Sequence, residues 1–504
     1  MATGQSATEA DTAAGFESEV QALGHRLLAA AGKEPPRLYR GIGGWLVRGT
    51  MEDAALRTAL FEFVDALPQL DGGDTAAHLA AYLSAVPTTG WRQFLIRLTA
   101  RRGLAWLARG AVGHLAGQFL VAETGSALSR AAARLARVPA RLTVDAVGEA
   151  VLSEAEADRY LARNRAILGW LEAPHLSIKL TGLTSQFDPL DAAGTRRRIF
   201  HRLAPLIDEA CRRRATLTVD MEHYELKPLI LDLFLQMLEE WPDPAWQPAL
   251  ALQAYLPETG RDIERLLAAA QRHGRRIGVR LVKGAYWDQE AAWAAQRGWP
   301  QPTLADKAAT DAHFERLTSI LLAHADALHP AIASHNLRSQ SVALAHARRL
   351  GLAPERWEAQ LLYGMAEPLR DALAAAGVPL RIYVPTGDPV IGIAYLIRRL
   401  LENTASTSVL RLSYIAGADA GTLLAPPCAL PAEPSAATAP APLNLPLLDF
   451  SRREERDAFA AALRGVRAGL PQCARHDVAN AATHVARNPA QPDEILGTTA
   501  LAGA

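Results

Sequence analysis

Eight short apolar runs lie between residues 141 and 403, and each is followed by a stretch whose apolar spacing is that of a helix. The runs are Arg141–Val147, His175–Leu180, Thr216–Asp220, Ala249–Tyr255, Ile277–Lys283, Pro330–His335, Ala359–Tyr363 and Pro379–Val384. Eightfold alternation of strand and helix is typical of a (β/α)8 barrel. We therefore expect an α/β fold, with a (β/α)8 TIM-type barrel over residues 139–415.

Polar and charged residues occur at or just past the end of each run. In this fold the carboxyl ends of the strands meet at one mouth, so these side chains should lie together. They are Glu149, Lys179, Asp220, Gln253, Arg280, Lys283, His335, Asn336, Gln360 and Tyr383. Hydrophobic packing has no use for so many polar groups at equivalent positions, and the sequence thus predicts a binding site there.

The remaining segments differ in composition. Residues 1–15 are small, polar and acidic, which indicates a disordered tail, and residues 16–138 have the spacing of an all-helical arm domain. Residues 416–441 are rich in Ala and Pro and are typical of a linker. Residues 442–504 hold one helical stretch, Arg452–Ala468, followed by loop-like sequence.

Charge and cysteine content limit the function classes. The chain has 53 basic and 53 acidic residues, so a formal net charge of +0 gives no case for nucleic acid. Its 3 cysteines form no CxxC pair, and the sequence shows neither a signal peptide nor a long uncharged apolar stretch. We expect a cytoplasmic protein. The basic stretch 92–141 is interpreted as a helix with a solvated face, and the alternative is a peripheral helix on the inner membrane face.

The segment Arg381–Asn403 holds two adjacent arginines in an otherwise apolar helix. Arg398 and Arg399 follow Tyr395, and Glu402 lies four residues after Arg398. A guanidinium binds a carboxylate through two parallel hydrogen bonds, so two of them can hold one tightly. The alternative is that both arginines face solvent, with Glu402 as a surface partner.

The segment Arg280–Glu290 combines cations, a glycine and aromatic rings. Gly284 permits close backbone approach, and Tyr286 and Trp287 follow in the loop where a ligand would lie. A ring beside a cation can stack on a planar cofactor. The alternative is a loop aromatic buried against a neighbouring helix.

Lys179 ends an apolar run and is either a Schiff-base nucleophile or a fixed positive charge for an anion. No metal site is expected, because Glu222, His223 and Glu225 lack a recognisable ligand spacing. The sequence also lacks HExxH, GxGxxG and P-loop motifs. A dinucleotide would therefore bind without a Rossmann domain.

Taken together, seven motifs resemble the proline dehydrogenase family, and more closely the proline dehydrogenase half of bifunctional proline utilization A. They are SIKL at Lys179, VDMEHYE at Asp220, LQAY at Gln253, RLVKGAYWDQE, ASHN at His335, GMAEPL, and IYVPTGDP followed by AYLIRRLLEN. The C-terminal LPLLDFSRREERDAF and NPAQPDEILGTT are similar to the opening of the family's aldehyde dehydrogenase half. The rest of that half is not in this sequence, so we expect no aldehyde dehydrogenase activity from this chain. That half is an expected partner if the full-length chain continues.

The resemblance implies oxidation of L-proline to pyrroline-5-carboxylate, with hydride transfer to N5 of FAD and electrons passed to a membrane quinone. It also implies site roles by position. Substrate residues would be Lys179, Tyr286, Leu362, Tyr383, Tyr395, Arg398, Arg399 and Glu149, with Asp220 bordering the reacting groups. Cofactor residues would be Gln253, Arg280, Val282, Lys283, Gly284, Ala285, Trp287, His335, Asn336, Gln360 and Glu402.

Two alternatives remain open. One is a Schiff-base lyase on the same barrel, with Lys179 or Lys283 as nucleophile. The other is a non-catalytic relative that senses proline. One departure from the family pattern is Ala305, where relatives commonly carry a hydroxyl residue ahead of the stretch containing Lys307, Thr310 and Asp311.

Overall fold

A computed structural model describes residues 2–32, 117–387 apart from 118, 137, 149, 150 and 173, then 419–427, 447–473 and 483–500. Single residues 58, 62, 78 and 81 are also described. Eight parallel strands form a closed barrel in chain order, and β1 pairs with β8 from Ala140↔Leu380 to Ala146↔Thr386. The expected barrel is confirmed.

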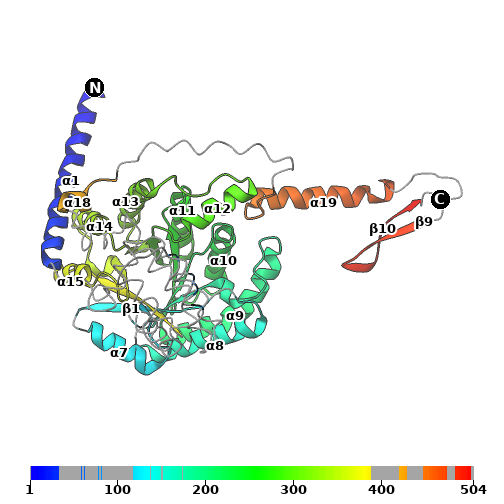
Figure 1. Ribbon diagram of the computed structural model, residues 1–504, viewed down its shortest axis with the longest axis horizontal. Coiled ribbons are helices and arrows are strands. Elements are labelled where there is room, and N and C mark those ends of the chain that lie inside the picture. The colour runs from blue at the N-terminus through cyan, green and yellow to red at the C-terminus, as the bar shows by residue number, and fades with distance from the viewer. Residues whose placement is uncertain are drawn as a thin grey trace.

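Every strand begins within two residues of its predicted start. The strands are β1 (Ala140–Ala146), β2 (His175–Ile178), β3 (Thr216–Val219), β4 (Gln247–Gln253), β5 (Ile277–Val282), β6 (Leu328–Ala333), β7 (Glu358–Leu362) and β8 (Leu380–Thr386). Their outward-facing residues are apolar and pack under the surrounding helices, which Figure 1 shows around the barrel.

Helices follow the strands, and several of them begin at a residue whose side chain caps the first turn. They are α8 (Glu154–Trp170), α9 (Ala192–Arg213), α10 (Lys227–Glu240), α11 (Thr259–His273), α12 (Trp287–Arg297), α13 (Lys307–Ala323), α14 (Leu337–Arg349) and α15 (Glu367–Ala375), with α7 (Gly125–Leu135) before β1. The side chains of Ser153, Asp191 and Asp306 each accept a hydrogen bond from a backbone N–H in the first turn. Such caps satisfy groups that the helix itself cannot. Two short 3-10 helices, η4 (Leu180–Leu183) and η5 (Pro354–Arg356), also lie in the barrel region.

The chain ends differ from their predictions. Helix α1 (Ala2–Ala31) runs through residues 2–15, where a disordered tail was expected. Within the expected linker, α18 (Ala420–Leu424) is a short helix that buries Leu423 and Leu424. Figure 1 shows α18 beside α1.

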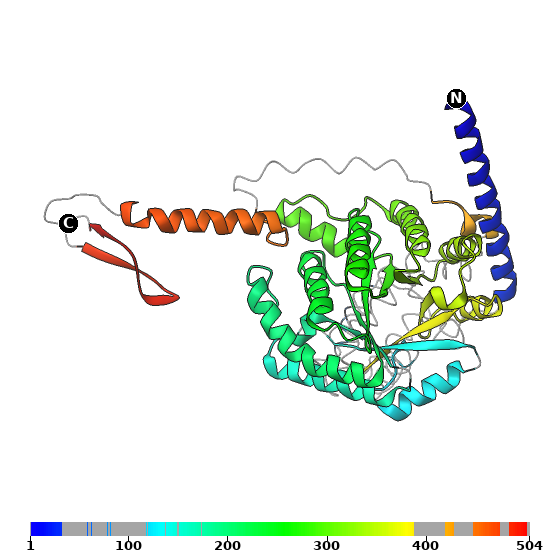
Figure 2. The same ribbon diagram turned by 180° about the vertical axis from the view of Figure 1, so that it is seen from behind.

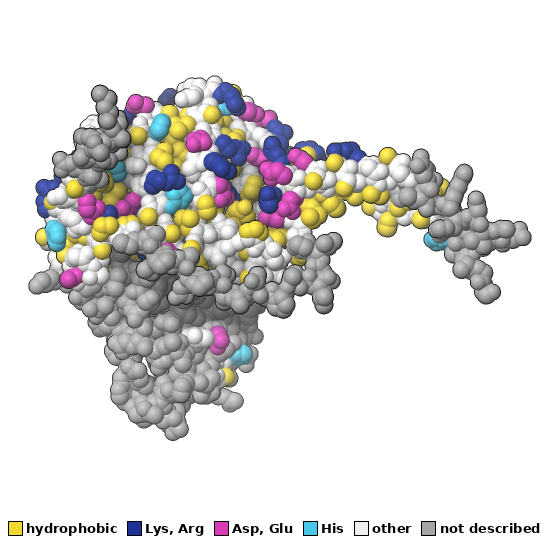
Figure 3. Space-filling model, turned by 90° about the horizontal axis from the view of Figure 1, so that it is seen from above, with side chains coloured by type: hydrophobic (Ala, Val, Ile, Leu, Met, Phe, Trp, Pro, Cys, Tyr) yellow, Lys and Arg dark blue, Asp and Glu magenta, His cyan; other side chains and the backbone are white. Residues whose placement is uncertain are grey.

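The C-terminal segment extends away from the barrel. The expected helix is present as α19 (Arg453–Cys473), but β9 (Thr483–Asn488) and β10 (Gln491–Ala500) form an antiparallel hairpin where loop was expected. Figure 2 shows α19 and the hairpin projecting from the body, and Figure 3 shows hydrophobic side chains along this projection. Leu463 and Val466 are among the exposed ones. Among the described residues, no helix has the length and apolar character that crossing a membrane requires.

Candidate active site

Charged side chains from three strand ends and a tyrosine from β8 meet inside the mouth of the barrel. Lys179 follows β2, Asp220 follows β3, Arg280 lies in β5 and Tyr383 in β8. One Asp220 oxygen accepts a hydrogen bond from Arg280 at 2.6 Å, and the other accepts one from the Tyr383 hydroxyl at 3.1 Å. The Lys179 ammonium lies 3.9 Å from that second oxygen. The structure thus brings together four residues that were predicted separately.

Lys179 is held as a cation by two carboxylates. Its Nζ lies 2.8 Å from Asp145 and its backbone N–H donates to the hydroxyl of Tyr160 at 2.9 Å. Burial alone would lower the pKa of Lys179, but Asp145 and Asp220 together raise it above its ordinary value. Burial also raises the pKa of Asp220, against the attraction of nearby cations. A lysine with a raised pKa suits an anion better than it suits nucleophilic attack.

Arg280 is fixed by partners on several strands. Its Nε donates to Gln360 at 2.8 Å, and one terminal nitrogen donates to Ser177 at 2.8 Å and to Asp220. The guanidinium also lies over the Tyr383 ring, 5.0 Å from its centre. A planar group with so many partners is positioned before any ligand arrives.

Two further predicted cofactor residues, Gln253 and Lys283, lie at the ends of the neighbouring strands β4 and β5. Gln253 closes β4 and donates to the backbone carbonyl of Glu222 at 3.0 Å. Lys283 follows β5, and its ammonium lies 2.6 Å from Asp311, which also pairs with Lys307 at 2.7 Å. Burial lowers the pKa of Lys283 to about 8 despite Asp311, and the two lysines hold the pKa of Asp311 below its ordinary value although burial raises it.

The loop after β5 comes close to β4 and its following turn. Gly284 has a φ of +124°, and a Cβ there would lie 2.5 Å from the buried ring of Tyr255. Only glycine fits this combination of backbone angle and space. Trp287 opens α12 and its indole N–H donates to the carbonyl of Leu304 at 2.8 Å. The ring nitrogen is therefore used by the protein itself.

The other predicted residues of this region are placed as follows. Val282 ends β5 and Ala285 follows Gly284 in the loop. The Tyr286 ring lies against His223, 4.2 Å between ring centres. Leu362 ends β7, and its N–H donates to Nε2 of His335 at 2.9 Å.

Asn336 caps the helix that follows β6. Its side chain accepts a hydrogen bond from the N–H of Ser339 at 3.0 Å. The cap fixes the start of α14 at the barrel mouth, where backbone N–H groups favour an anion such as a phosphate.

The donor set fits a flavin. The amide oxygen of Gln253 is buried and has no hydrogen-bond partner among the residues that the structure describes. A flavin ring carries an N–H group that could donate a hydrogen bond to this oxygen. Leaving a buried acceptor without a donor is unfavourable for the folded protein. Lys283 and the start of α14 would supply positive potential for the phosphates of such a cofactor.

Five predicted residues lie outside the described residues. They are Glu149, Tyr395, Arg398, Arg399 and Glu402. Their roles therefore rest on the sequence.

Residues missed by sequence reasoning include Asp145 and Tyr160. Asp145 lies inside the first apolar run, whereas the predicted carboxylate, Glu149, lies beyond its end. A signal was present, because a carboxylate at an alternate position of an apolar strand faces the barrel interior. Tyr160 is in α8, and burial raises its pKa to about 12. Nothing local in the sequence points to Tyr160.

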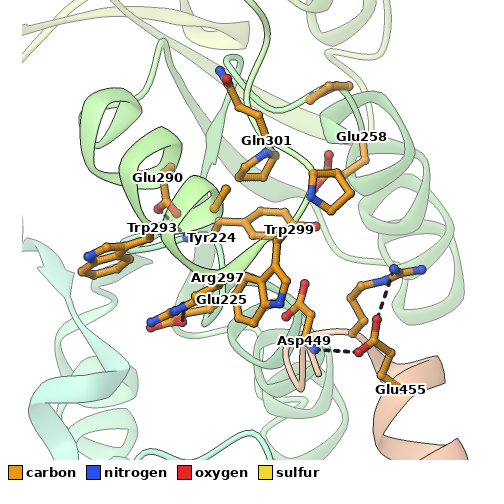
Figure 4. Close-up of a pocket in the computed structure, with 15 residues that line it drawn as sticks. Tyr224, Glu225, Glu258, Glu290, Trp293, Arg297, Trp299, Gln301, Asp449 and Glu455 are labelled. Atoms are coloured by element: carbon orange, nitrogen blue, oxygen red, sulfur yellow. Dashed lines mark hydrogen bonds and ion pairs between the residues drawn. The ribbon is translucent and has the colours of Figure 1, made fainter. Parts of the chain in front are cut away.

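A cavity of about 310 Å³ lies elsewhere, between α12 and residues 449–455 (Figure 4). Tyr224, Trp293 and Trp299 contribute to its wall, and Arg297 lies against Trp299 and pairs with Glu225 at 2.6 Å. Among the described residues, those predicted for the site do not line this cavity. The barrel mouth remains the candidate active site.

Comparisons with known proteins agree with this fold. Residues 128–412 match the proline dehydrogenase family, and residues 17–119 match the proline utilization A N-terminal domain. The bifunctional protein PutA of Salmonella typhimurium is 30% identical over 335 residues, 62% of this chain and 25% of its own length. The chain thus spans a quarter of that relative.

Two further relatives support the same family. Human mitochondrial proline dehydrogenase 1 is 30% identical over 233 residues, 44% of this chain and 39% of its own length. The crystal structure of proline utilization A from Bdellovibrio bacteriovorus, inactivated by N-propargylglycine, superposes with a TM-score of 0.86 at 29% identity, covering 97% of this chain and 52% of that one. Because the family match covers more than half of the chain, this protein belongs to the proline dehydrogenase family and is of the proline utilization A type.

Proposed function

We propose that this chain oxidises L-proline to pyrroline-5-carboxylate with FAD and passes the electrons to a membrane quinone. The observation that carries the proposal is the buried cluster of Lys179, Asp220, Arg280 and Tyr383 at the mouth of a proline dehydrogenase barrel. Active sites of this fold lie at that end of the strands.

The substrate carboxylate would bind to cations. Lys179 is kept charged by its carboxylate partners, and Arg398 and Arg399 would add two guanidinium groups. Tyr383, Tyr395, Leu362 and Tyr286 would form the walls around the ring, and Glu149 would cover the pocket by pairing with Arg398. Fixing the carboxylate aims the ring and reduces the entropy that the reaction must lose.

FAD would supply the redox chemistry, by taking a hydride at flavin N5. The protein's own contribution is to bind and orient. Arg280 would approach N5, Gln253 would accept from the ring, and Lys283 with the start of α14 would favour the phosphates. Trp287, His335, Asn336, Gln360 and Glu402, with the backbone at Val282, Gly284 and Ala285, would contact the rest.

An absorption spectrum tests the proposal directly. We expect purified protein to be yellow, with a visible band that bleaches when L-proline is added without oxygen. A colourless protein that still binds no FAD after reconstitution, or a flavin unchanged by proline, would contradict it. A dye acceptor then measures turnover.

The substrate clamp has its own test. We expect Arg399→Met to raise the KM for proline about a hundredfold while FAD stays bound, because a bidentate charged contact is lost. Arg196→Met, at an exposed arginine paired with Glu240, is the control and should leave KM unchanged. A normal KM in Arg399→Met would refute the carboxylate assignment.

One observation favours the Schiff-base alternative. Lys283, with its pKa lowered to about 8, is the lysine such an enzyme would use. Borohydride trapping of a carbonyl substrate on Lys283 in a flavin-free protein would support that alternative.

We also propose two partners, a membrane quinone and the aldehyde dehydrogenase half. Electron transfer to a quinone requires contact with a membrane surface, and the aldehyde dehydrogenase half would accept the product in a longer chain. Vesicle sedimentation with and without proline tests the first of these two partners.

A further inference from the structure

The inside of this barrel is polar, whereas branched apolar residues usually fill such interiors. Arg280, Glu358, Gln360 and Arg381 face inward from β5, β7 and β8, and all four are buried. The apolar core lies instead between the strands and the helices. These inward side chains are close enough to form one connected network.

A hydrogen-bonded series runs up β7 toward the mouth. Arg381 Nε donates to Oε1 of Glu358 at 2.7 Å, and Gln360 Nε2 donates to the same oxygen at 2.7 Å. The side-chain amide oxygen of Gln360, Oε1, then accepts a hydrogen bond from Arg280 Nε at 2.8 Å. Glu358 is thus linked to Arg280 through a single amide.

This series fixes the orientation of the amide. An ionised carboxylate only accepts hydrogen bonds, so Glu358 requires the NH2 group of Gln360 to face it. The amide oxygen must then face Arg280. Burial would raise the pKa of Glu358, but Arg381 and His329 hold it well below its ordinary value, so the carboxylate stays charged.

We propose that Glu358 is a positioning residue that acts through Gln360 to aim the Arg280 guanidinium at the reacting end of the site. The inference rests on the proposed function for the role of Arg280 beside a flavin. With Glu358 neutral, the Gln360 amide can reverse and present NH2 to the Arg280 N–H. Arg280 then loses the acceptor for its Nε.

Two variants break the series at different links. Glu358→Gln removes the charge that orients the amide, and Gln360→Met removes the amide but leaves the Glu358–Arg381 pair intact. The second variant covers the case in which the first fails to fold. Asp262→Asn is the control, because Asp262 is also a buried carboxylate, paired with Lys227 at 2.7 Å outside the barrel interior.

In the FAD-loaded protein we measure flavin reduction by proline in a single turnover, the proline KM and the midpoint potential of the flavin. Misplacing a reacting group by about 1 Å can cost roughly a hundredfold in rate. We expect both variants to reduce the flavin at least tenfold more slowly, with KM changed less than threefold. The potential should be lower, because the guanidinium charge favours the reduced flavin. Asp262→Asn should match the parent protein in all three.

Unchanged reduction rate and potential in a folded Glu358→Gln and Gln360→Met pair would overturn the inference. Failure of the proposed function is distinguishable, because the parent protein itself would then hold no flavin or would not react with proline. Crystal structures of the two variants would show directly whether the Arg280 guanidinium moves. An Arg280 guanidinium that keeps its contacts to Asp220 and Ser177 in both would refute the positioning role, and a displaced one would support it.

Discussion

Charge balance within the barrel explains how so many ionised residues are buried together. Three cations, Lys179, Arg280 and Arg381, lie with three carboxylates, Asp145, Asp220 and Glu358, and the ion pairs join them across strands. A buried charge without a partner is expensive, so each member depends on the others. A ligand anion entering near Lys179 meets a cation that already has a fixed position.

Asp145 provides a test of this balance. We expect Asp145→Asn to lower the free energy of unfolding by about 2–3 kcal/mol, because Lys179 loses its 2.8 Å partner and keeps Asp220 only at 3.9 Å. Urea denaturation measures the change. Asp158→Asn, at an exposed carboxylate paired with Arg202, should cost less than about 1 kcal/mol. Equal losses in the two variants would contradict the argument.

Lys283 should make stability depend on pH. Burial lowers its pKa to about 8, whereas an ordinary lysine has 10.5. Between these values the unfolded chain binds more protons than the folded one, so the free energy of unfolding rises with pH through this window. The gain is at most about 3 kcal/mol.

The comparison with Lys283→Met isolates this contribution, and Asp311 keeps Lys307 as a partner in that variant. Unfolding free energies measured from pH 7.5 to 10.5 should show the parent protein gaining on the variant as pH rises. A constant difference across the range would show that Lys283 does not titrate in this window.

At the scale of elements, the strands were predictable because each one is a short apolar run that ends in a polar residue facing the barrel interior. Lys179 and Asp220 stand one residue past β2 and β3, and the period-two pattern fixed which side each residue faces. Glu358 was not predicted because it precedes Ala359, the first residue of the apolar run. Its importance depends on Arg280 and Arg381, which lie on other strands and are not visible in any local pattern.

In the loop after β5, the conformation depends on a single residue, Gly284. We expect Gly284→Ala to destabilise the protein by about 2–5 kcal/mol, since it combines a strained φ with a Cβ 2.5 Å from the Tyr255 ring. Gly274→Ala is the matched control, because Gly274 also has a positive φ, +59°, and no atom of the described residues lies within 4 Å of an added Cβ. Its cost should be about 1 kcal/mol. Thermal unfolding compares the two, and similar losses would show that the Tyr255 contact is unimportant.

At the scale of the whole molecule, contacts between distant segments were not predictable. Helix α1 packs on the barrel helices, and Figures 1 and 2 both show it along their flank. Its contact with Arg338 joins residues separated by 321 positions. Composition alone indicated a linker at residues 416–441, because that prediction could not include the surface against which Leu423 and Leu424 are buried.

Arg338 joins four helices and is the strongest test of this assembly. It donates to Glu315 of α13 at 2.9 Å, to Glu17 of α1 at 2.7 Å and to the carbonyl of Leu424 of α18 at 2.8 Å, while lying in α14 itself. We expect Arg338→Met to cost about 3 kcal/mol, because Glu315 and Glu17 are left without this cation. Amide exchange should accelerate in residues 16–31 and 420–424 more than in the barrel strands.

Arg349→Met is the control that distinguishes the loss of the Arg338 contacts from a general loss of positive charge on α14. Arg349 pairs with Glu19 of α1 at 2.8 Å, but the two side chains are 42% and 31% exposed, so the pair should contribute less than about 1 kcal/mol. If the two variants showed the same exchange in α1, apolar packing of Val20, Leu23 and Leu27 would hold the helix without the buried arginine. If only Arg338→Met loosened both α1 and α18, one buried guanidinium would connect these two helices to α13 and α14 of the barrel.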